Sequence, residues 1–303
     1  MAHLTLKNRL GDSHPLLKAL VWIGIGMVLT IGAFALYSTC VTDTQSIRAL
    51  KTLQLLQSLS VFVLPALAAA YLFSNRPAVW LHIDKHPTGK QTLWAVLTIL
   101  IALPGINLLA DLNSRLTLPE SMAGIEALLK DLEHQAALLT EQFLHTDSVW
   151  QLVGNLLLMA LLPALGEELT FRAVLPNLFT SQDAQSNTPH VAIWVSAVIF
   201  SAFHMQFYGF VPRMLLGAMF GYAVCWSGSL WVPVLMHLTN NALAVIASYL
   251  DQRGLTDSSQ WEQFGIGDTA WVGCLSLVLT FGMMVLLYRQ TQPHHSTLNT
   301  PLS

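Results

Sequence analysis

Two adjacent glutamates and an arginine occur in the stretch GEELTFR, residues 166–172, inside one of the most apolar parts of the chain. The sequence before this stretch reads VGNLLLMALLPAL, and the sequence after it reads AVLPNLF. Ionisable side chains in a hydrocarbon environment are costly and by default indicate a functional site. A buried carboxylate that lacks a charged partner is suited to proton transfer, so the chemistry to expect here is general-base catalysis.

Helical geometry separates the roles of the two glutamates. Successive residues of an α-helix point about 100° apart, so Glu167 and Glu168 cannot face the same spot. Residues four apart share a face, so Glu168 lies against Arg172, with the acid first, which is the better order. We therefore expect Glu168 and Arg172 to form a supporting ion pair and Glu167 to act as the base. The alternative is that all three form one ion-pair network that holds helices together.

Two later stretches, FSAFHMQ (200–206) and HLTNN (237–241), add polar groups that could work with Glu167. The first places His204 among apolar residues, where a histidine is more often a satisfied core residue than a catalytic one. In the second, His237 and Asn241 are four residues apart on one helix face, and both can donate hydrogen bonds to an oxyanion. The alternative for this pair is hydrogen bonding between helices, which is common in membranes.

Composition defines the class of protein. The 303 residues are 53% hydrophobic and only 10% charged, whereas a soluble domain has about 25% charged residues. The chain is therefore expected to be an integral membrane protein, surrounded by the lipid bilayer. The net charge of −3 is spread thinly, without a basic cluster, and this excludes nucleic acid as an expected partner. The cysteines at 40, 225 and 274 form no CxxC pair and indicate no disulfide framework.

The predicted fold is all-α, a bundle of about eight transmembrane helices. A span needs about 20 mostly apolar residues, and continuous hydrophobicity excludes barrel strands, which alternate. The expected spans lie near 17–38, 53–74, 91–111, 149–178, 190–208, 211–227, 230–250 and 270–288. The first is interpreted as a retained span rather than a cleaved signal. Prolines 65, 104 and 163 fall inside spans and should kink or break them.

The remaining segments complete the organisation. Apolar residues recur at helical spacing in the acidic loop 113–148, which predicts an amphipathic helix on the membrane or over the bundle. The tail after Arg289 is expected to be disordered. We divide the chain into three spans with the loop helix (1–148), a catalytic core (149–250), and a last span with the tail (251–303). The weak bias of basic residues favours both termini inside.

The expected depths of the polar side chains in the membrane support a common site. At 1.5 Å per residue from the expected inner ends of their spans, Glu167, His204 and His237 lie roughly 16, 21 and 12 Å deep. One carboxylate, two imidazoles and a carboxamide near the membrane midplane form a plausible hydrolytic centre.

The three stretches also resemble a known set of motifs. EELTFR (167–172), FSAFH (200–204) and HLTNN (237–241) are similar to EExxxR, FxxxH and HxxxN. In that order, these motifs mark the CAAX-protease and bacteriocin-processing (CPBP) family of intramembrane proteases, also called the Abi family, which includes the type II CAAX prenyl endopeptidases. The resemblance covers about residues 150–250.

The resemblance implies a peptidase with its site in a cavity within the membrane. The glutamate matching Glu167 would activate water with help from the histidine matching His204, and the residues matching His237 and Asn241 would stabilise the oxyanion. Glu168 and Arg172 match the other motif members. The implied substrate is a membrane-associated peptide or protein, possessing a CAAX-like terminus in the prenyl-protease members, and the expected location is the plasma (inner) membrane.

Two alternatives stay open at this stage. No cofactor is expected, but Glu167, His204 and His237 could form a zinc site with an open fourth position, as in metallopeptidases. The chain could instead be a non-enzymatic immunity or scaffold protein, or a proton-linked transporter. The polar groups lie in one half of the chain only, which argues against a transporter.

Overall fold

The computed structural model describes residues 6–44, 46–179 and 189–291. Over these ranges the chain forms helices and no β-strand, which confirms the predicted all-α fold class. The helices of the first half are α1 (Pro15–Cys40), α2 (Ile47–Ser58), η1 (Leu59–Val63), α3 (Leu64–Phe73), α4 (Pro77–Trp80), α5 (Gly89–Ser114), η2 (Glu120–Met122) and α6 (Ala123–Leu144). Those of the second half are α7 (Val149–Asn155), η3 (Leu156–Leu161), α8 (Leu162–Glu168), η4 (Leu169–Val174), α9 (Leu175–Phe179), α10 (Pro189–Phe203), η5 (Phe207–Gly209), α11 (Phe210–Ser227), α12 (Trp231–Gln252), α13 (Ser258–Gln263), η6 (Gly267–Thr269) and α14 (Ala270–Thr291).

Seven helical stretches in the described residues are long and apolar enough to cross a membrane. They are Pro15–Cys40, Ile47–Phe73, Gly89–Ser114, Val149–Phe179, Phe207–Ser227, Trp231–Gln252 and Gly267–Gln290. The expected span at 190–208 is instead the shorter apolar helix α10, of 15 residues. It ends before His204, and Met205 then adopts the left-handed conformation with φ 55°. The protein is thus a polytopic bundle of seven long helices and one short one, as predicted in outline.

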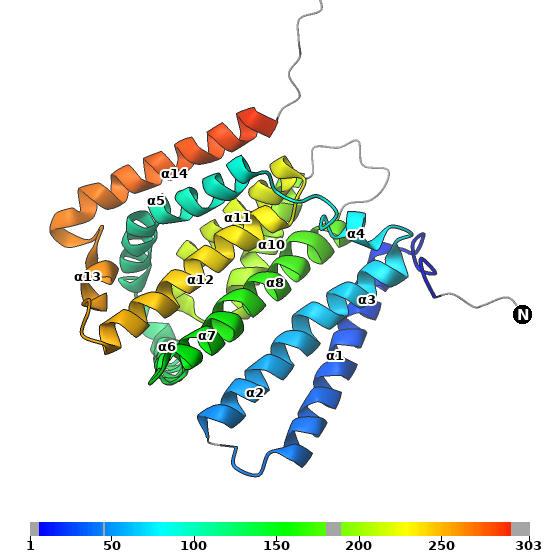
Figure 1. Cartoon of the computed structure of the whole chain (residues 1–303), viewed down its shortest axis with the longest axis horizontal. Coiled ribbons are helices and arrows are strands. Elements are labelled where there is room, and N and C mark those ends of the chain that lie inside the picture. Colours follow the sequence, from blue (N-terminus) through cyan, green and yellow to red (C-terminus); the bar gives the residue numbers. More distant parts are fainter. Residues whose placement is uncertain (1–5, 45, 180–188, 292–303) are drawn as a thin grey trace, which may run out of the picture.

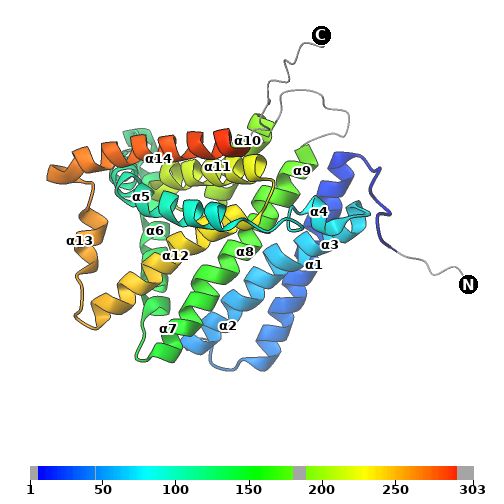
Figure 2. The same ribbon diagram turned by 45° about the horizontal axis from the view of Figure 1, so that its top comes forward.

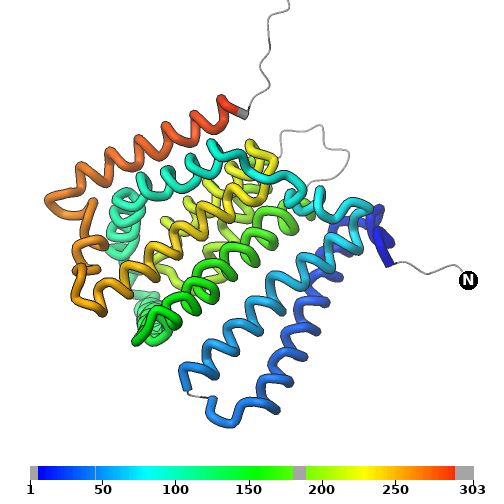
Figure 3. The backbone as a smooth tube through the Cα atoms, in the orientation of Figure 1, coloured from blue at the N-terminus to red at the C-terminus, as the bar shows by residue number. Residues whose placement is uncertain are grey.

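The central helix is span four, defined here as the continuous stretch Val149–Phe179, which lies between the α2–α3 stretch and α12. Figures 1 and 2 show α1 packed against the α2–α3 stretch on one side of the molecule, and α5 against α14 on the other. Helix α12 lies between span four and α5, while α10 and α11 pack against each other. The tube in Figure 3 shows span four and α12 running close together along the middle of the molecule.

Three of these stretches are π-helical turns, which contain one residue more than an α-helical turn. They are η1, η3 and η4, and each is followed by a leucine and then a proline. The leucine N–H bonds to the carbonyl five residues back, as in Leu175 N–H to Thr170 O. Pro65 and Pro163 therefore mark local departures from α-geometry, as predicted. Pro104 does not, because α5 continues through it.

Neighbouring helices hold the π-helical turn η4, called the wide turn below, in place. Pro176 has no N–H, so it cannot bond to the carbonyl of Phe171, five residues back. The hydroxyl of Ser196, on α10, donates to that carbonyl instead. On the other side, the Thr170 hydroxyl donates to the carbonyl of Phe62 in η1, at 3.3 Å. Polar contacts thus hold the segment that carries Arg172 between η1 and α10.

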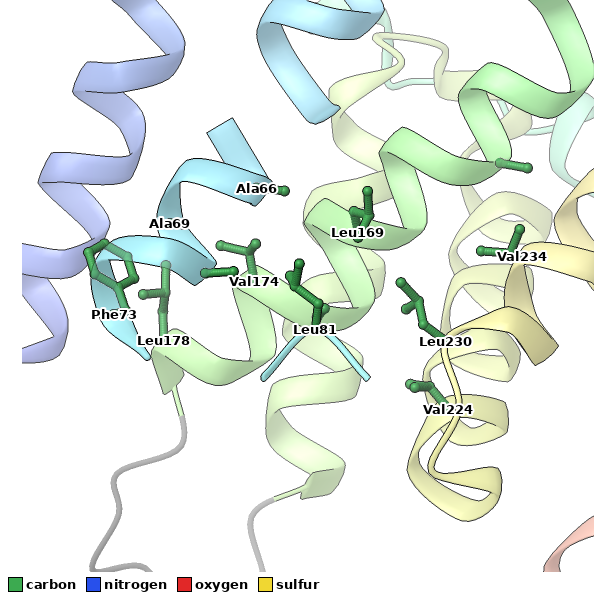
Figure 4. Close-up of a cluster of buried hydrophobic side chains, with 13 residues drawn as sticks. Ala66, Ala69, Phe73, Leu81, Leu169, Val174, Leu178, Val224, Leu230 and Val234 are labelled. Carbon is green, nitrogen blue, oxygen red and sulfur yellow. The ribbon is translucent and has the colours of Figure 1, made fainter. Parts of the chain in front are cut away.

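An apolar cluster supports the end of span four. Figure 4 shows Leu81, from the loop after α4, between Val174 of η4 and Leu230, which precedes α12. Leu81 and Leu230 are 1% exposed, and Val174 is fully buried. Burial of apolar surface stabilises by about 25 cal/mol per Å². The cluster therefore stabilises the contact of three segments that are distant in sequence, at one end of the site.

The predicted amphipathic helix in the 113–148 loop is present as α6. Its buried apolar residue is Phe143, and its N-terminal half exposes Ile125 and Leu128. Hydrogen bonds attach it to the bundle: the Asn155 amide donates to the Phe143 carbonyl, the Gln252 amide donates to the Leu144 carbonyl, and Glu133 accepts the Tyr208 N–H. Helix α6 therefore lies over η5, next to the segment that carries His204.

The packing of the α13–α14 connection against α5 gives a testable prediction. Gly265 has φ +101°, and a Cβ atom there would collide with the Pro104 carbonyl. Gly265→Ala should therefore destabilise the protein by about 1–3 kcal/mol, because both the conformation and the contact are unavailable to alanine. Gly282→Ala is the matched control, since a Cβ at Gly282 meets no atom within 4 Å. Thermal unfolding in detergent measures both, and equal melting temperatures would contradict the prediction.

Candidate active site

The core of the site is the ion pair between Glu168 and Arg172. Glu168 is fully buried at the end of α8, and the Arg172 side chain, in η4, is 1% exposed. Arg172 Nε lies 3.1 Å from Glu168 Oε2. The ion pair expected from the spacing is therefore present.

The Arg172 guanidinium lies between two aromatic rings. Its central carbon is 4.3 Å from the centroid of Phe200 and 5.6 Å from that of Phe220. A cation over an aromatic face is attracted by the ring quadrupole, and the attraction is stronger away from water. Phe200 of α10 and Phe220 of α11 thus keep the charge of Arg172 in a fixed position beside Glu168.

His237 makes a second contact to Glu168 that the sequence did not indicate. Its Nδ1 lies 2.9 Å from Glu168 Oε1, and the ring is buried. Because an ionised carboxylate can only accept, Nδ1–H donates in this bond. The opposite nitrogen, Nε2, then faces Glu167, whose Oε2 lies 3.9 Å away. Glu168 therefore orients the imidazole toward the second glutamate.

Glu167 is the more accessible of the two glutamates. Its side chain is 14% exposed, against 0% for Glu168, and its Oε2 lies 3.9 Å from Nε2 of His237. Arg213 of α11 also lies within electrostatic range of Glu167 and of His204. Arg213 donates from Nη2 to Gln206 Oε1 at 2.8 Å. Arg213 and Gln206 belong to none of the three motifs, so the sequence analysis did not identify Arg213 as a basic group near the site.

His204 lies just beyond the end of α10. Its Nδ1 is 2.9 Å from the Phe200 carbonyl. A carbonyl only accepts, so Nδ1 carries the hydrogen, and Nε2 is left with its lone pair. The ring packs edge-on against Phe200, with centroids 5.0 Å apart, and Phe200 in turn contacts His237 and Arg172. His204 is therefore positioned as a hydrogen-bond acceptor on the same aromatic support.

Asn241 is one turn after His237 on α12. Its amide donates to the carbonyl of Met159 in η3, at 3.4 Å, and its oxygen accepts from Asn240 at 3.2 Å. One Nδ2 hydrogen remains for another partner. The structure thus brings Glu167, Glu168, Arg172 and His237 into direct contact, and places His204 and Asn241 on neighbouring segments.

The residues fit a zinc site poorly. Among the described parts of the chain, no group of three or more histidine, cysteine, aspartate or glutamate side chains is arranged to hold a metal ion. His204 and His237 hold their Nδ1 atoms on the Phe200 carbonyl and the Glu168 carboxylate, but their Nε2 atoms do not converge with Glu167 into such a group. No step of the chemistry below is therefore assigned to a metal.

The described residues thus form an all-helical membrane bundle in which Glu168, Arg172 and His237 are buried and Glu167 is partly accessible. Residues 149–243 match the family model described as Type II CAAX prenyl endopeptidase Rce1-like. The match includes all three motifs and confirms the resemblance drawn from them, although it covers less than half of the 303 residues. The comparison with curated proteins and the comparison with solved structures each gave no match.

Proposed function

We propose that this protein is an intramembrane endopeptidase in which Glu167 activates the attacking water. The family supports a CAAX-type membrane endopeptidase in general. The observation that carries the assignment within the site is the difference between the two glutamates. Glu168 is fully buried between Arg172 and His237, whereas Glu167 is partly accessible and faces His237 Nε2.

The proposed reaction begins with a water molecule between Glu167 and the Nε2 of His204. Glu167 takes a proton from the water, and the oxygen of the water attacks the carbonyl carbon of the scissile peptide bond. The carbonyl oxygen becomes an oxyanion. When the C–N bond breaks, Glu167 returns the proton to the leaving nitrogen, which departs as an amine, and the new carboxylic acid then gives up its remaining proton to water.

His237 and Asn241 stabilise the oxyanion in this proposal. Glu168 and Arg172 act through His237: the Glu168 carboxylate accepts the Nδ1–H and orients the ring, and in its imidazolium form the ring donates Nε2–H to the oxyanion. Asn241 supplies its remaining Nδ2 hydrogen. Donors fixed in advance in a site with little water are worth more than donors in solution.

The proposed substrate is a membrane-associated peptide or protein, with a CAAX-like terminus as the first class to test, and the proposed location is the plasma (inner) membrane. The experiment compares membrane peptides in cells that carry the wild type or Glu167→Ala. Uncleaved substrate should accumulate with Glu167→Ala. If none accumulates and Glu167→Ala fully complements a deletion strain, the protein is a scaffold or a transporter rather than a peptidase.

Chelation gives a further prediction. Because the ligand atoms available in the described residues do not form a set for zinc, the purified protein should keep its peptidase activity after exhaustive chelation and dialysis. The measurement is the cleavage rate of a peptide substrate before and after treatment. Loss of activity that added zinc restores would show that the glutamate and histidines bind metal.

A further inference from the structure

The turn between α10 and α11, residues 204–209, carries His204 but has little support of its own. Met205 has φ 55°, a left-handed conformation that is unfavourable for a residue with a side chain and persists only where the surrounding structure imposes it. Gly209, at the N-terminal cap of α11, makes no side-chain hydrogen bond to the helix. The position of His204 therefore depends on groups that come from other helices.

Asn113, near the end of α5, supplies two such contacts. Its Nδ2 donates to the Phe207 carbonyl at 2.9 Å, and its Oδ1 accepts the Val211 N–H at 2.9 Å. The first N–H groups of a helix have no partner within it, so Asn113 does for α11 what a capping residue normally does. The side chain lies in a residue that is 3% exposed, and α5 packs against both η5 and α11. One buried amide thus joins the turn and the start of α11 to α5.

Two further side chains hold this region, each through one hydrogen bond to its backbone. The Ser201 hydroxyl of α10 donates to the Phe210 carbonyl at 2.7 Å, and Glu133 of α6 accepts the Tyr208 N–H at 3.2 Å. Asn113 differs because it binds one backbone group in η5 and another in the first turn of α11. It therefore fixes the spacing between these two segments.

We infer that Asn113 is a positioning residue for the reaction, and that it acts on His204 through this turn. The inference rests on the proposed function, in which His204 Nε2 holds the attacking water. The Phe200 carbonyl fixes the rotation of the imidazole, but the backbone at His204 sets where the ring stands. Misplacing a reacting group by about 1 Å can lower a rate by about 10²-fold. Asn113 lies outside the residues 149–243 that match the family model.

The chain offers a matched control on the same helix. Asn107 of α5 also donates to two backbone carbonyls, those of Trp261 and Phe264, at 2.7 and 3.0 Å. These carbonyls lie in and just after α13, not in the turn that carries His204. Asn107→Ala therefore loosens a different connection through the same kind of contact.

Two variants of Asn113 separate its two hydrogen bonds. Asn113→Ala removes both of them. Asn113→Asp has nearly the same shape, and its carboxylate still accepts the Val211 N–H, at a helix N-terminus that favours an acidic group. That carboxylate cannot donate to the Phe207 carbonyl. The aspartate variant should therefore fold and still release one side of the turn.

Two measurements on the detergent-purified full-length protein test the inference. Amide hydrogen exchange should become faster over residues 205–211 in both Asn113 variants, and over residues 261–266 in Asn107→Ala. With a cleavable peptide, kcat per folded molecule should fall at least about tenfold in both Asn113 variants, with little change in KM. Asn107→Ala should keep the wild-type kcat, because its contacts are remote from His204.

Wild-type kcat in folded Asn113→Asp would overturn the inference, and this variant decides the matter if Asn113→Ala does not fold. A loss confined to KM, or an equal fall of kcat in Asn107→Ala, would also overturn it. The exchange measurement needs no turnover. If the wild type cleaves no substrate, the proposed function fails, whereas unchanged exchange over residues 205–211 in the Asn113 variants overturns this inference alone.

Discussion

Replacing Glu167 by glutamine should abolish peptide hydrolysis while leaving the protein folded. The amide keeps the size of the side chain but cannot accept a proton from water, so the rate should fall by about 10²–10⁴-fold or more. Folding should be little affected, because Glu167 is partly accessible and its contact with His237 is long, at 3.9 Å. The measurements are the cleavage rate of a reconstituted substrate and the melting temperature of the same preparation.

Two other glutamates make this experiment specific. Glu141→Gln, at an exposed position on α6, should leave both activity and melting temperature unchanged. Glu168→Gln should lower stability as well as activity, because Glu168 is buried between Arg172 and His237. If Glu168→Gln alone were inactive and Glu167→Gln kept normal activity, the two roles would be reversed and the proposed mechanism would be wrong.

Arg172→Ala should remove most of the folded protein. The change leaves the Glu168 carboxylate at 0% exposure without its cation and empties the space between Phe200 and Phe220. Breaking a buried ion pair by removing one partner costs about 3–5 kcal/mol, which is a large part of the stability of an ordinary domain. The measurement is the yield of monodisperse protein in detergent, together with its melting temperature.

The chain contains a matched control for this prediction. Asp111 and Arg115 have the same spacing and order as Glu168 and Arg172, but their side chains are 21% and 67% exposed. Arg115→Ala should therefore cost only about 0–1 kcal/mol. The double variant Glu168→Gln with Arg172→Met removes both charges and should recover folded protein while remaining inactive. Normal stability of Arg172→Ala would show that the pair does not support the bundle.

The sequence was sufficient to predict the fold class and the first contact of the site. A charge content of 10% indicates a lipid environment for so apolar a chain, and its continuous rather than alternating hydrophobicity then favours helices over barrel strands. The spacing of Glu168 and Arg172 predicts their ion pair, because both residues belong to one helix and local geometry is enough. The amphipathic helix α6 was predicted for the same reason, from the local recurrence of apolar residues.

Contacts between segments that are distant in sequence could not be predicted from local helix geometry. The hydrogen bond from His237 to Glu168 joins residues 69 positions apart, and the crossing of α12 over span four decides it. Local backbone geometry was also only partly predictable. A leucine and a proline follow η1, η3 and η4, yet Leu103 and Pro104 lie in an unbroken helix. Whether a wide turn forms therefore depends on partners such as Ser196, which accommodates the carbonyl that Pro176 leaves unbonded.

The wide turn η4 has a consequence for how relatives of this chain can be aligned. A π-helical turn holds one residue more than an α-helical turn, so it can be gained or lost through a single-residue insertion or deletion without disturbing the helix on either side. Removing one residue from Leu169–Val174 would convert η4 to a regular helical turn and keep the residues after it in the same places relative to the glutamates. Homologues with a regular helix here should therefore differ by a one-residue gap, and only an alignment that allows such a gap would match arginines that occupy the same place.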